Sequence, residues 1–168
     1  NKDRIVYIRS FSKTLLPGLR LGMAVLPDSL QKQFLDFKNS MDLNTSILTQ
    51  AALEIFLRSS MYRFHAKRTK EHYKNKMSRL QEYCKEAQGC GTWYIPQTGL
   101  YAYLETGSIS SQLLERSLLD SKVLVSSTNQ SYLNGFEHPE GLRLCVCNAE
   151  DQEIEKAVRI IETKLAEF

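Results

Sequence analysis

An α/β fold is what this sequence predicts, and three observations predict it. The chain has 168 residues, 42% hydrophobic and 24% charged, which suits one globular domain or a piece of a larger protein. Short apolar segments of strand length alternate with longer segments whose apolar residues recur at the helical period. Turn-forming residues separate these segments, and 8 Gly with 4 Pro are too few for a disordered chain.

Two strands joined by a turn are predicted at the start of the chain. Arg4 to Arg9 and Leu19 to Leu26 have the length and residue types of strands, and Pro17 and Gly18 form a turn between them. Ile5 to Tyr7 read as a buried strand that begins without a helix or cap before it. We therefore expect a truncated chain.

Three helices are predicted next, because apolar residues recur every three or four positions between capping and breaking residues. The first helix is expected to start at Asp28 or Ser29, and a polar linker from Asn39 to Ser46 follows it. The second is expected to start at Thr45 or Ser46 and to break near Ser59 and Ser60. The third is expected to end at Gly89 and Gly91.

The third of these helices is expected to be amphipathic and basic. Between Met61 and Glu86, eight Lys or Arg stand against three Glu, so the positive charge is concentrated in one segment. The basic face consists of Arg63, Lys67, Lys70 and Lys74, beside an apolar stripe of Tyr62, Ala66, Thr69, Tyr73, Met77, Leu80 and Cys84. Such a face suits an anion or a nucleic acid, but the accompanying acids and the lack of interleaved aromatics favour a solvated face.

From Thr92 onward the pattern predicts a compact unit of short strands with two helices among them. The expected strands are Trp93 to Ile95, Leu100 to Leu104, Lys122 to Val125 and Leu142 to Val146. The expected helices are one capped by Ser108 that runs through Leu113, Leu114 and Leu118, and a last one capped by Asn148 with Asp151 three residues later.

The composition argues against several classes of protein. No apolar run is long enough to cross a bilayer, and Asn1 opens neither a signal peptide nor a transit sequence, so we expect a cytoplasmic protein with no membrane contact. The four cysteines match no common zinc spacing and are expected to be reduced and mostly structural. His65 and His72 have no third ligand in register, so no metal site is expected.

The residues that carry chemistry follow the first strand. Lys13 directly follows Ser12, Ser10 lies three residues before it, and Arg20 lies seven residues after it. The lysine must lose its proton before it can attack a carbonyl, and a nearby positive charge such as Arg20 favours that loss. Hydroxyl groups and a planar guanidinium bind phosphate well, and Gly18 and Gly22 would let a ligand approach the backbone closely. The segment thus suits a phosphorylated aldehyde cofactor.

The wording Ser-Phe-Ser-Lys followed by Pro-Gly-Leu-Arg-Leu-Gly resembles the cofactor-lysine signature of fold-type I, aspartate-aminotransferase-like enzymes that use pyridoxal 5′-phosphate (PLP). From Tyr7 to Pro27 the chain is most similar to the aminotransferase-like domain of MocR-type regulators in the GntR family. The similarity continues more weakly through Gln50 to Leu53, His65 to Arg79, Gly99 and Leu142 to Leu144. The resemblance implies an α/β fold that is the C-terminal part of a fold-type I PLP-dependent transferase, with the end of the large domain and the small α/β domain.

The resemblance also implies a role for each site residue. In the intact protein Lys13 would be the catalytic lysine and form the internal aldimine with PLP. The hydroxyls of Ser10 and Ser12 and the guanidinium of Arg20 would hold the cofactor's phosphate. Arg143, late in the chain, would pair with the α-carboxylate of the substrate.

Strand alternation places Arg143 on the face opposite Leu142 and Leu144. An arginine that points away from the apolar face is able to bind a carboxylate, although strand arginines are also common members of surface ion pairs. Cys145 and Cys147 share the face of Arg143 and could form a redox pair. We expect buried, inert thiols instead, because strand neighbours two positions apart rarely bridge well.

The chain departs from the family's pattern in ways that affect activity. Only twelve residues precede Lys13, so the aspartate that pairs with the pyridinium nitrogen is not in this sequence, and Asp3 is too close to replace it. This chain alone is therefore expected not to transaminate. The second glycine often seen after Gly99 is missing, and 126–134 replaces a glycine-containing loop, which leaves the substrate open.

Three segments are expected: a remnant of the large PLP-binding domain at 1–45, connecting helices at 46–91, and a small α/β domain at 92–168. The resemblance implies a PLP-binding effector or sensor domain of a GntR/MocR-type transcription regulator, which senses an amine or amino acid. A homodimer is expected, with DNA bound only through an N-terminal domain missing here. The alternatives are a fragment of a cytosolic class I/II aminotransferase that acts on an amino acid, and a standalone interaction domain that keeps the lysine by descent only.

Overall fold

The computed structural model describes residues 2–41, 44–86 and 91–168. The contacts between residues divide the chain into two compact units, Asn1–Lys67 and Arg68–Phe168. The boundary falls inside the long helix α3, Met61–Glu86, which begins in the first unit and continues in the second. The three domain segments expected from the sequence concern the intact protein and stay a prediction.

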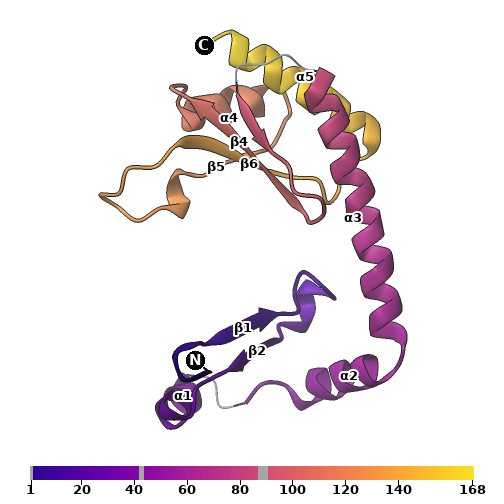
Figure 1. Ribbon diagram of the computed structural model, residues 1–168, viewed down its shortest axis with the longest axis vertical. Coiled ribbons are helices and arrows are strands. Elements are labelled where there is room, and N and C mark those ends of the chain that lie inside the picture. The colour runs from indigo at the N-terminus through magenta and orange to yellow at the C-terminus, as the bar shows by residue number, and fades with distance from the viewer. Residues whose placement is uncertain (1, 42–43, 87–90) are drawn as a thin grey trace. The chain divides into compact units, whose positions relative to one another are not determined.

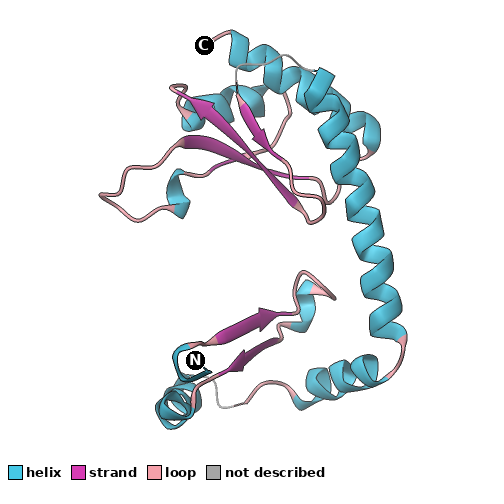
Figure 2. Ribbon diagram, in the orientation of Figure 1, coloured by secondary structure: helices cyan, strands magenta, loops and turns pink. Residues whose placement is uncertain are grey.

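The first unit is built around an antiparallel pair of strands, β1 (Tyr7–Ser10) and β2 (Gly22–Val25). The short 3-10 helix η1 (Lys2–Arg4) precedes them, and a second one, η2 (Pro17–Leu19), lies within the connection between them, as Figure 2 shows. Proline fixes the backbone angle that the first turn of η2 needs. The two strands and their turn are thus where the sequence predicted them, although both strands are shorter.

The apolar start of the chain is exposed, and the expectation of a buried strand there is wrong for the described residues. Ile5, Val6 and Tyr7 are 62%, 43% and 50% exposed. The reason is that β1 pairs with β2 alone, and no other described strand joins this two-stranded ladder. In the first unit, the large hydrophobic side chains that are buried among the described residues are Phe11 and Leu21, at the base of the connection.

Three helices follow the strands, as predicted. The helix α1 spans Asp28–Met41 and α2 spans Ile47–Arg58, before α3. The side chain of Ser46 accepts a hydrogen bond from the backbone N–H of Thr49 and so caps α2. The polar linker is shorter than expected because α1 continues to Met41. Of the two glycines expected to end α3, Gly89 lies outside the described residues, and Gly91 follows the helix, which spans Met61–Glu86.

The second unit contains a four-stranded antiparallel sheet in the order β3-β4-β6-β5. Its strands are β3 (Thr92–Tyr94), β4 (Tyr101–Gly107), β5 (Ser126–Ser127) and β6 (Glu140–Cys145). Its helices are α4 (Ser111–Asp120), the 3-10 helix η3 (Asn129–Ser131) and α5 (Asp151–Ala166). Figure 1 shows α4 and α5 together on one face of the sheet.

The hydrophobic core lies between that face of the sheet and the helices. One cluster joins Leu104 and Leu142 of the sheet to side chains of α4 and α5, and a second joins Met77 of α3 to Ala102 of the sheet and Val158 of α5. Burying one such side chain stabilises the fold by about 1.5–3 kcal/mol. The apolar stripe predicted for α3 is buried or half-buried along its length, and its basic face is exposed, as predicted.

Three local predictions in the second unit are wrong. Residues 122–125 are not a strand, because Lys122 has a left-handed backbone (φ 64°) that ends α4 and turns the chain. Ser108 does not cap α4, which has Ser110 at its N-cap position. Asn148 does not cap α5, because Glu150 does so in a capping box with Glu153. Among the described residues, none of the helices has the length and apolar character to cross a membrane.

Candidate functional site

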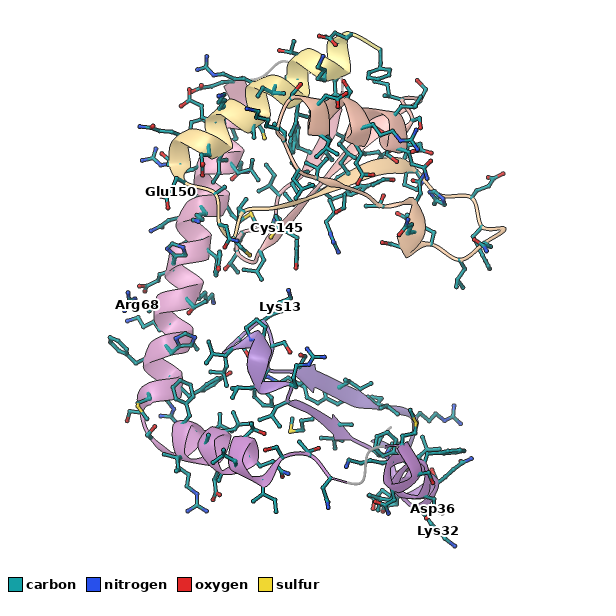
Figure 3. The ribbon with its side chains drawn as sticks, turned by 180° about the vertical axis from the view of Figure 1, so that it is seen from behind. Lys13, Lys32, Asp36, Arg68, Cys145 and Glu150 are labelled. Carbon is teal, nitrogen blue, oxygen red and sulfur yellow. The ribbon has the colours of Figure 1, made fainter. Side chains whose placement is uncertain are left out.

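The lysine predicted to bind the cofactor lies in the connection between β1 and β2. Ser10 is the last residue of β1 and is paired with Gly22, the first residue of β2. Directly beyond this pair, the backbone N–H of Phe11 donates to the carbonyl of Leu21 at 3.0 Å. Lys13 is exposed and lies near the tip of the loop that these pairs close (Figure 3).

A tight turn presents Lys13 and brings the two serines together. The backbone N–H groups of Thr14 and Leu15 both donate to the carbonyl of Phe11, at 3.2 and 2.9 Å. The backbone N–H of Ser12 donates to Oγ of Ser10 at 3.2 Å. The Phe11 side chain between the two serines is buried, at 6% exposure, and anchors the turn.

The first turns of α3 hold this loop in place. The guanidinium of Arg9 donates a hydrogen bond to the hydroxyl of Tyr62 and lies 5.5 Å from the centre of the Phe11 ring. Nε2 of His65 lies 3.2 Å from the carbonyl oxygen of Thr14, inside the turn itself. The sequence did not single out Arg9, Tyr62 or His65 as site residues. The helical spacing of Tyr62 and His65 was visible, but the residues they contact, Arg9 and Thr14, lie about fifty positions earlier.

Arg20 has an unusual backbone for an arginine. Its φ of 50° and ψ of 40° lie in the left-handed region, which costs energy for a residue other than glycine. Its backbone N–H donates to the carbonyl of Pro17 at 3.4 Å and ends η2. Residues held in such conformations cluster at functional sites. The side chain of Arg20 is exposed, at the other end of the loop that contains Lys13.

The donors in this loop fit a phosphorylated aldehyde. Two hydroxyls and one guanidinium can donate to phosphate oxygens, and one primary amine can meet the aldehyde. The two glycines are not required by packing within the described chain. Nothing lies within 4 Å of a Cβ built on Gly18, and on Gly22 the nearest atom is the carbonyl oxygen of Arg9 at 3.4 Å. Close approach of a ligand to these glycines stays a prediction.

Arg143 lies on β6 in the second unit, on the exposed face of the sheet. Leu142, Leu144 and Val146 are buried, and Arg143 is exposed, so the predicted alternation is confirmed. Its guanidinium carbon lies 5.1 Å from the centre of the Tyr101 ring, within the range of a cation–π interaction. The ion pairs found among the described residues are Arg58–Glu54, Arg79–Glu82, Arg159–Glu155 and Lys164–Glu167, which do not include Arg143.

Aromatic residues surround Arg143 on that face. Tyr103 and Ser126 are its partners on the two neighbouring strands. The rings of Tyr94 and Tyr103 lie 5.7 Å apart, next along the same face. The Tyr103 ring covers Gly141, where a Cβ would collide with it. The result is a tyrosine-rich surface around Arg143, whose guanidinium can pair with a carboxylate and whose rings can pack against an apolar group.

A polar cluster at the start of α4 was not predicted from the sequence. One carboxylate oxygen of Glu140 accepts from the backbone N–H of Ser111 at 2.7 Å and also from its hydroxyl. Nδ2 of Asn129 donates to the same carboxylate, and the hydroxyls of Ser111 and Ser127 lie 2.8 Å apart. Hydrogen bonds from the Ser111 side chain, and then from its backbone, hold the pKa of Glu140 below its ordinary value. This cluster fixes the start of α4.

The cysteines differ from the expectation of buried, inert thiols. Cys145 is exposed and Cys147 is half-buried, because the face of β6 that carries Arg143 is open. Cys84 is also half-buried, and burial, and then the nearby Glu162, raise the pKa of its thiol to about 12. Cys90 lies outside the described residues. Within the residues that the structure describes, no three His, Cys, Asp or Glu side chains gather as metal ligands would.

The family model for "Aminotransferase class I and II" matches residues 1–161. Among curated proteins, the chain is 30% identical to the uncharacterized HTH-type transcriptional regulator YcxD of Bacillus subtilis, over 97% of this chain and 38% of that protein. It is 26% identical to the mouse mitochondrial kynurenine/alpha-aminoadipate aminotransferase, over 79% of this chain and 32% of that protein.

Solved structures of aminotransferases have the same fold as this chain. The kynurenine aminotransferase of Pyrococcus horikoshii superimposes with a TM-score of 0.91 at 20% identity, over 99% of this chain and 42% of that one. The alpha-aminoadipate aminotransferase LysN of Thermus thermophilus superimposes with a TM-score of 0.85 at 24% identity, over 96% and 42%. The chain thus has the fold of the C-terminal part of a fold-type I transferase and spans about two fifths of the length of these proteins.

Proposed function

Because the chain belongs to the aminotransferase class I and II family, we propose that it is the PLP-binding, aminotransferase-like effector domain of a GntR/MocR-type transcription regulator. The observation that carries this proposal is its similarity, over nearly its whole length, to an HTH-type regulator of Bacillus subtilis. Two further HTH-type regulators of that bacterium are 29% and 27% identical to it. Contact with DNA would belong to the part of such a protein that this chain does not include.

The loop between β1 and β2 supports PLP as the cofactor. When bound, PLP supplies an aldehyde that accepts an amine and a ring that withdraws electrons from it. Lys13 provides the amine at the tip of the loop. Ser10 and Ser12 hold the phosphate by hydrogen bonds from their hydroxyls, and Arg20 holds it by charge and by its planar guanidinium. The contacts of Arg9 with Tyr62 and of His65 with Thr14 tie this loop to α3.

The effector in this proposal is an amine or an amino acid. Its amino group competes with the amine of Lys13 for the same aldehyde. If it is an amino acid, its carboxylate pairs with Arg143, and its side chain packs against the tyrosines beside that arginine. The intact protein is a homodimer whose shape, and so whose DNA affinity, depends on whether the effector has displaced the lysine.

A second function is favoured by the similarity to the mouse aminotransferase. In that case the chain is the C-terminal part of an enzyme that acts on an amino acid. Nζ of Lys13, once released, would then also carry a proton to and from the substrate's α-carbon. Both functions use the same residues, so the residues of the site cannot separate them.

The experiment that separates them uses the full-length protein with PLP. Amino acids are added singly, and two quantities are measured: affinity for DNA from upstream of the protein's own gene, and release of the keto acid. A regulator changes its DNA affinity in response to an amino compound and releases no keto acid over many turnovers. Sustained keto acid release without a DNA response would contradict the regulator and support the enzyme.

A matched pair of variants tests whether the DNA response or the keto acid release depends on Lys13. Lys13→Ala is expected to abolish the response, because it removes the amine that holds the cofactor. Lys32→Ala, on the exposed side of α1, is expected to respond as the wild type does (Figure 3). A response that survives in Lys13→Ala would mean that this lysine has no part in sensing.

A further inference from the structure

Two thiols face one another at the end of β6, in a part of the second unit to which neither proposed function gives a role. Sγ of Cys145 donates a hydrogen bond to Sγ of Cys147 at 3.2 Å. Cys145 is the last residue of the strand, and the backbone bends at Cys147. Figure 3 shows the sulfur of Cys145 at this end of the strand. Two residues that would otherwise stand side by side on one face are thereby turned toward each other.

A lysine from α3 fixes the backbone of the second thiol. Nζ of Lys76 donates to the carbonyls of Val146, Cys147 and Ala149, at 3.2, 3.0 and 2.8 Å. An ammonium has three N–H donors, so all of them are used on this short segment. Lys76 therefore holds the bend that places Cys147 opposite Cys145.

The two thiols differ in access. Cys145 is exposed and open to small reagents, whereas Cys147 is half-buried against α3. Burial, and then the neighbouring Cys147 thiol, raise the pKa of the Tyr73 hydroxyl. Tyr73 of α3 is therefore a neighbour of Cys147. An exposed thiol with a shielded thiol in contact is the arrangement of an attacking and a resolving cysteine.

We propose that Cys145 and Cys147 form a modification site, at which a peroxide oxidises the pair to a reversible intrachain disulfide. The sulfur of Cys145 attacks one peroxide oxygen, the O–O bond breaks, and the leaving oxygen departs as water with the thiol's proton. The sulfur of Cys147 then attacks the Cys145 sulfur, the S–S bond forms, the S–O bond breaks, and a second water leaves. The two thiols lose two electrons and two protons, which the peroxide gains.

Cys84 provides the contrast within the same unit. Burial and the nearby Glu162 favour the uncharged form of its thiol, and that form is unreactive toward peroxide. Its contacts are apolar side chains of the core around Met77 and Val158. The proposal therefore assigns oxidation to one pair of cysteines and excludes Cys84.

The test is peptide mapping of the full-length protein after oxidation. The folded protein is treated with one equivalent of hydrogen peroxide, unfolded in iodoacetamide and digested with trypsin. The peptide 144–156 contains both cysteines of the pair and no other. It is expected to be lighter by the mass of two hydrogens and to take up no alkyl group, and dithiothreitol should restore uptake at both thiols. A peptide that still takes up two alkyl groups, or is joined to another peptide, would overturn the proposal.

Single variants test which thiol attacks and which resolves. Cys147→Ser leaves the attacking thiol without its partner, so dimedone, which traps sulfenic acid, should label Cys145 in this variant and not in the wild type. Equal labelling of both proteins would contradict a resolving role for Cys147. Cys84→Ser, the matched control, is expected to form the disulfide as the wild type does, and its loss there would also overturn the assignment.

Discussion

The guanidinium of Arg143 lies over the ring of Tyr101, its carbon 5.1 Å from the ring centre, and both side chains belong to the open face of the β4–β6 pair. An arginine without a carboxylate partner commonly extends into solvent. Here the ring limits where the guanidinium can go, at a gain of about 0.5–1 kcal/mol for an exposed site. The ring thus restrains the cation, and none of the ion pairs among the described residues includes Arg143. In the proposed function its partner is the carboxylate of the effector.

Replacing this cation should weaken the binding of carboxylate ligands. Arg143→Leu is expected to lower the affinity of the PLP-loaded, full-length protein for an amino acid by about 10- to 100-fold, because a charge-assisted hydrogen bond contributes about 1.5–3 kcal/mol. The affinity for the corresponding amine, which has no carboxylate, should not change. Calorimetric titration measures both. Arg116→Leu on α4 is the control, and an equal loss for amine and amino acid would argue against the carboxylate role.

The ring beneath the guanidinium should matter less than the charge. Tyr101→Phe keeps a ring and is expected to bind an amino acid like the wild type. Tyr101→Leu removes the ring and should weaken binding by about two- to fivefold, the equivalent of the cation–π interaction. The same titrations measure this difference. If the two variants bind equally well, the ring does not position Arg143.

Sequence patterns predicted those elements whose boundaries depend on neighbours along the chain. Ser46 could be named as a cap because the N–H that it accepts belongs to Thr49, three residues later. The β1–β2 turn could be predicted because Pro17 and Gly18 favour it locally. The same reasoning put Lys13 after the first strand and Arg20 within the second, held by the Pro-Gly turn. In the structure β2 begins only at Gly22, so both residues lie in the connection between the strands.

Sequence patterns did not predict features that depend on residues far away along the chain. Ser108 was expected to cap α4 because it stands before the apolar stripe. The structure satisfies the backbone N–H of Ser111 with Glu140, a residue 29 positions later, so no local signal could show it. Residues 122–125 do not form the expected strand for a different reason. Lys122 adopts a left-handed backbone, which is uncommon for a lysine and which the sequence does not indicate.

Glu140 should contribute stability that depends on pH. Its pKa in the folded protein lies below the ordinary value of 4.5, because Ser111 donates to its charged form. The contribution is therefore complete above that ordinary value and is lost as the pH falls through the lowered pKa. Glu140→Gln should lower the free energy of unfolding by about 1.5–3 kcal/mol at neutral pH.

Urea unfolding at a series of pH values measures this effect. The difference between the wild type and Glu140→Gln should shrink as the solution becomes more acidic and vanish once the carboxyl is protonated in both states. Glu137→Gln is the control, because that glutamate is exposed in the same segment and should change stability by no more than about 0.5 kcal/mol. A difference that stays constant across the pH range would mean that the charge of Glu140 is irrelevant.

Lys76 should stabilise the turn that leads into α5. Lys76→Met removes the three hydrogen bonds to the carbonyls of residues 146, 147 and 149 and is expected to cost about 2 kcal/mol. Lys74→Met changes an exposed lysine on the same helix and should be nearly neutral. Urea unfolding at neutral pH compares the two. Equal stability would mean that water satisfies those carbonyls as well as the ammonium does.

The central claim is that Lys13 is the amine that holds PLP, and the position of the covalently fixed cofactor tests it most directly. The full-length protein is mixed with one equivalent of PLP, reduced with borohydride, digested with trypsin and analysed by mass spectrometry. Because a modified Lys13 resists cleavage, the account predicts the phosphopyridoxyl group on the peptide 10–20. No such peptide, or the group spread over the lysines of α3 at equal yield in Lys13→Ala, would contradict it.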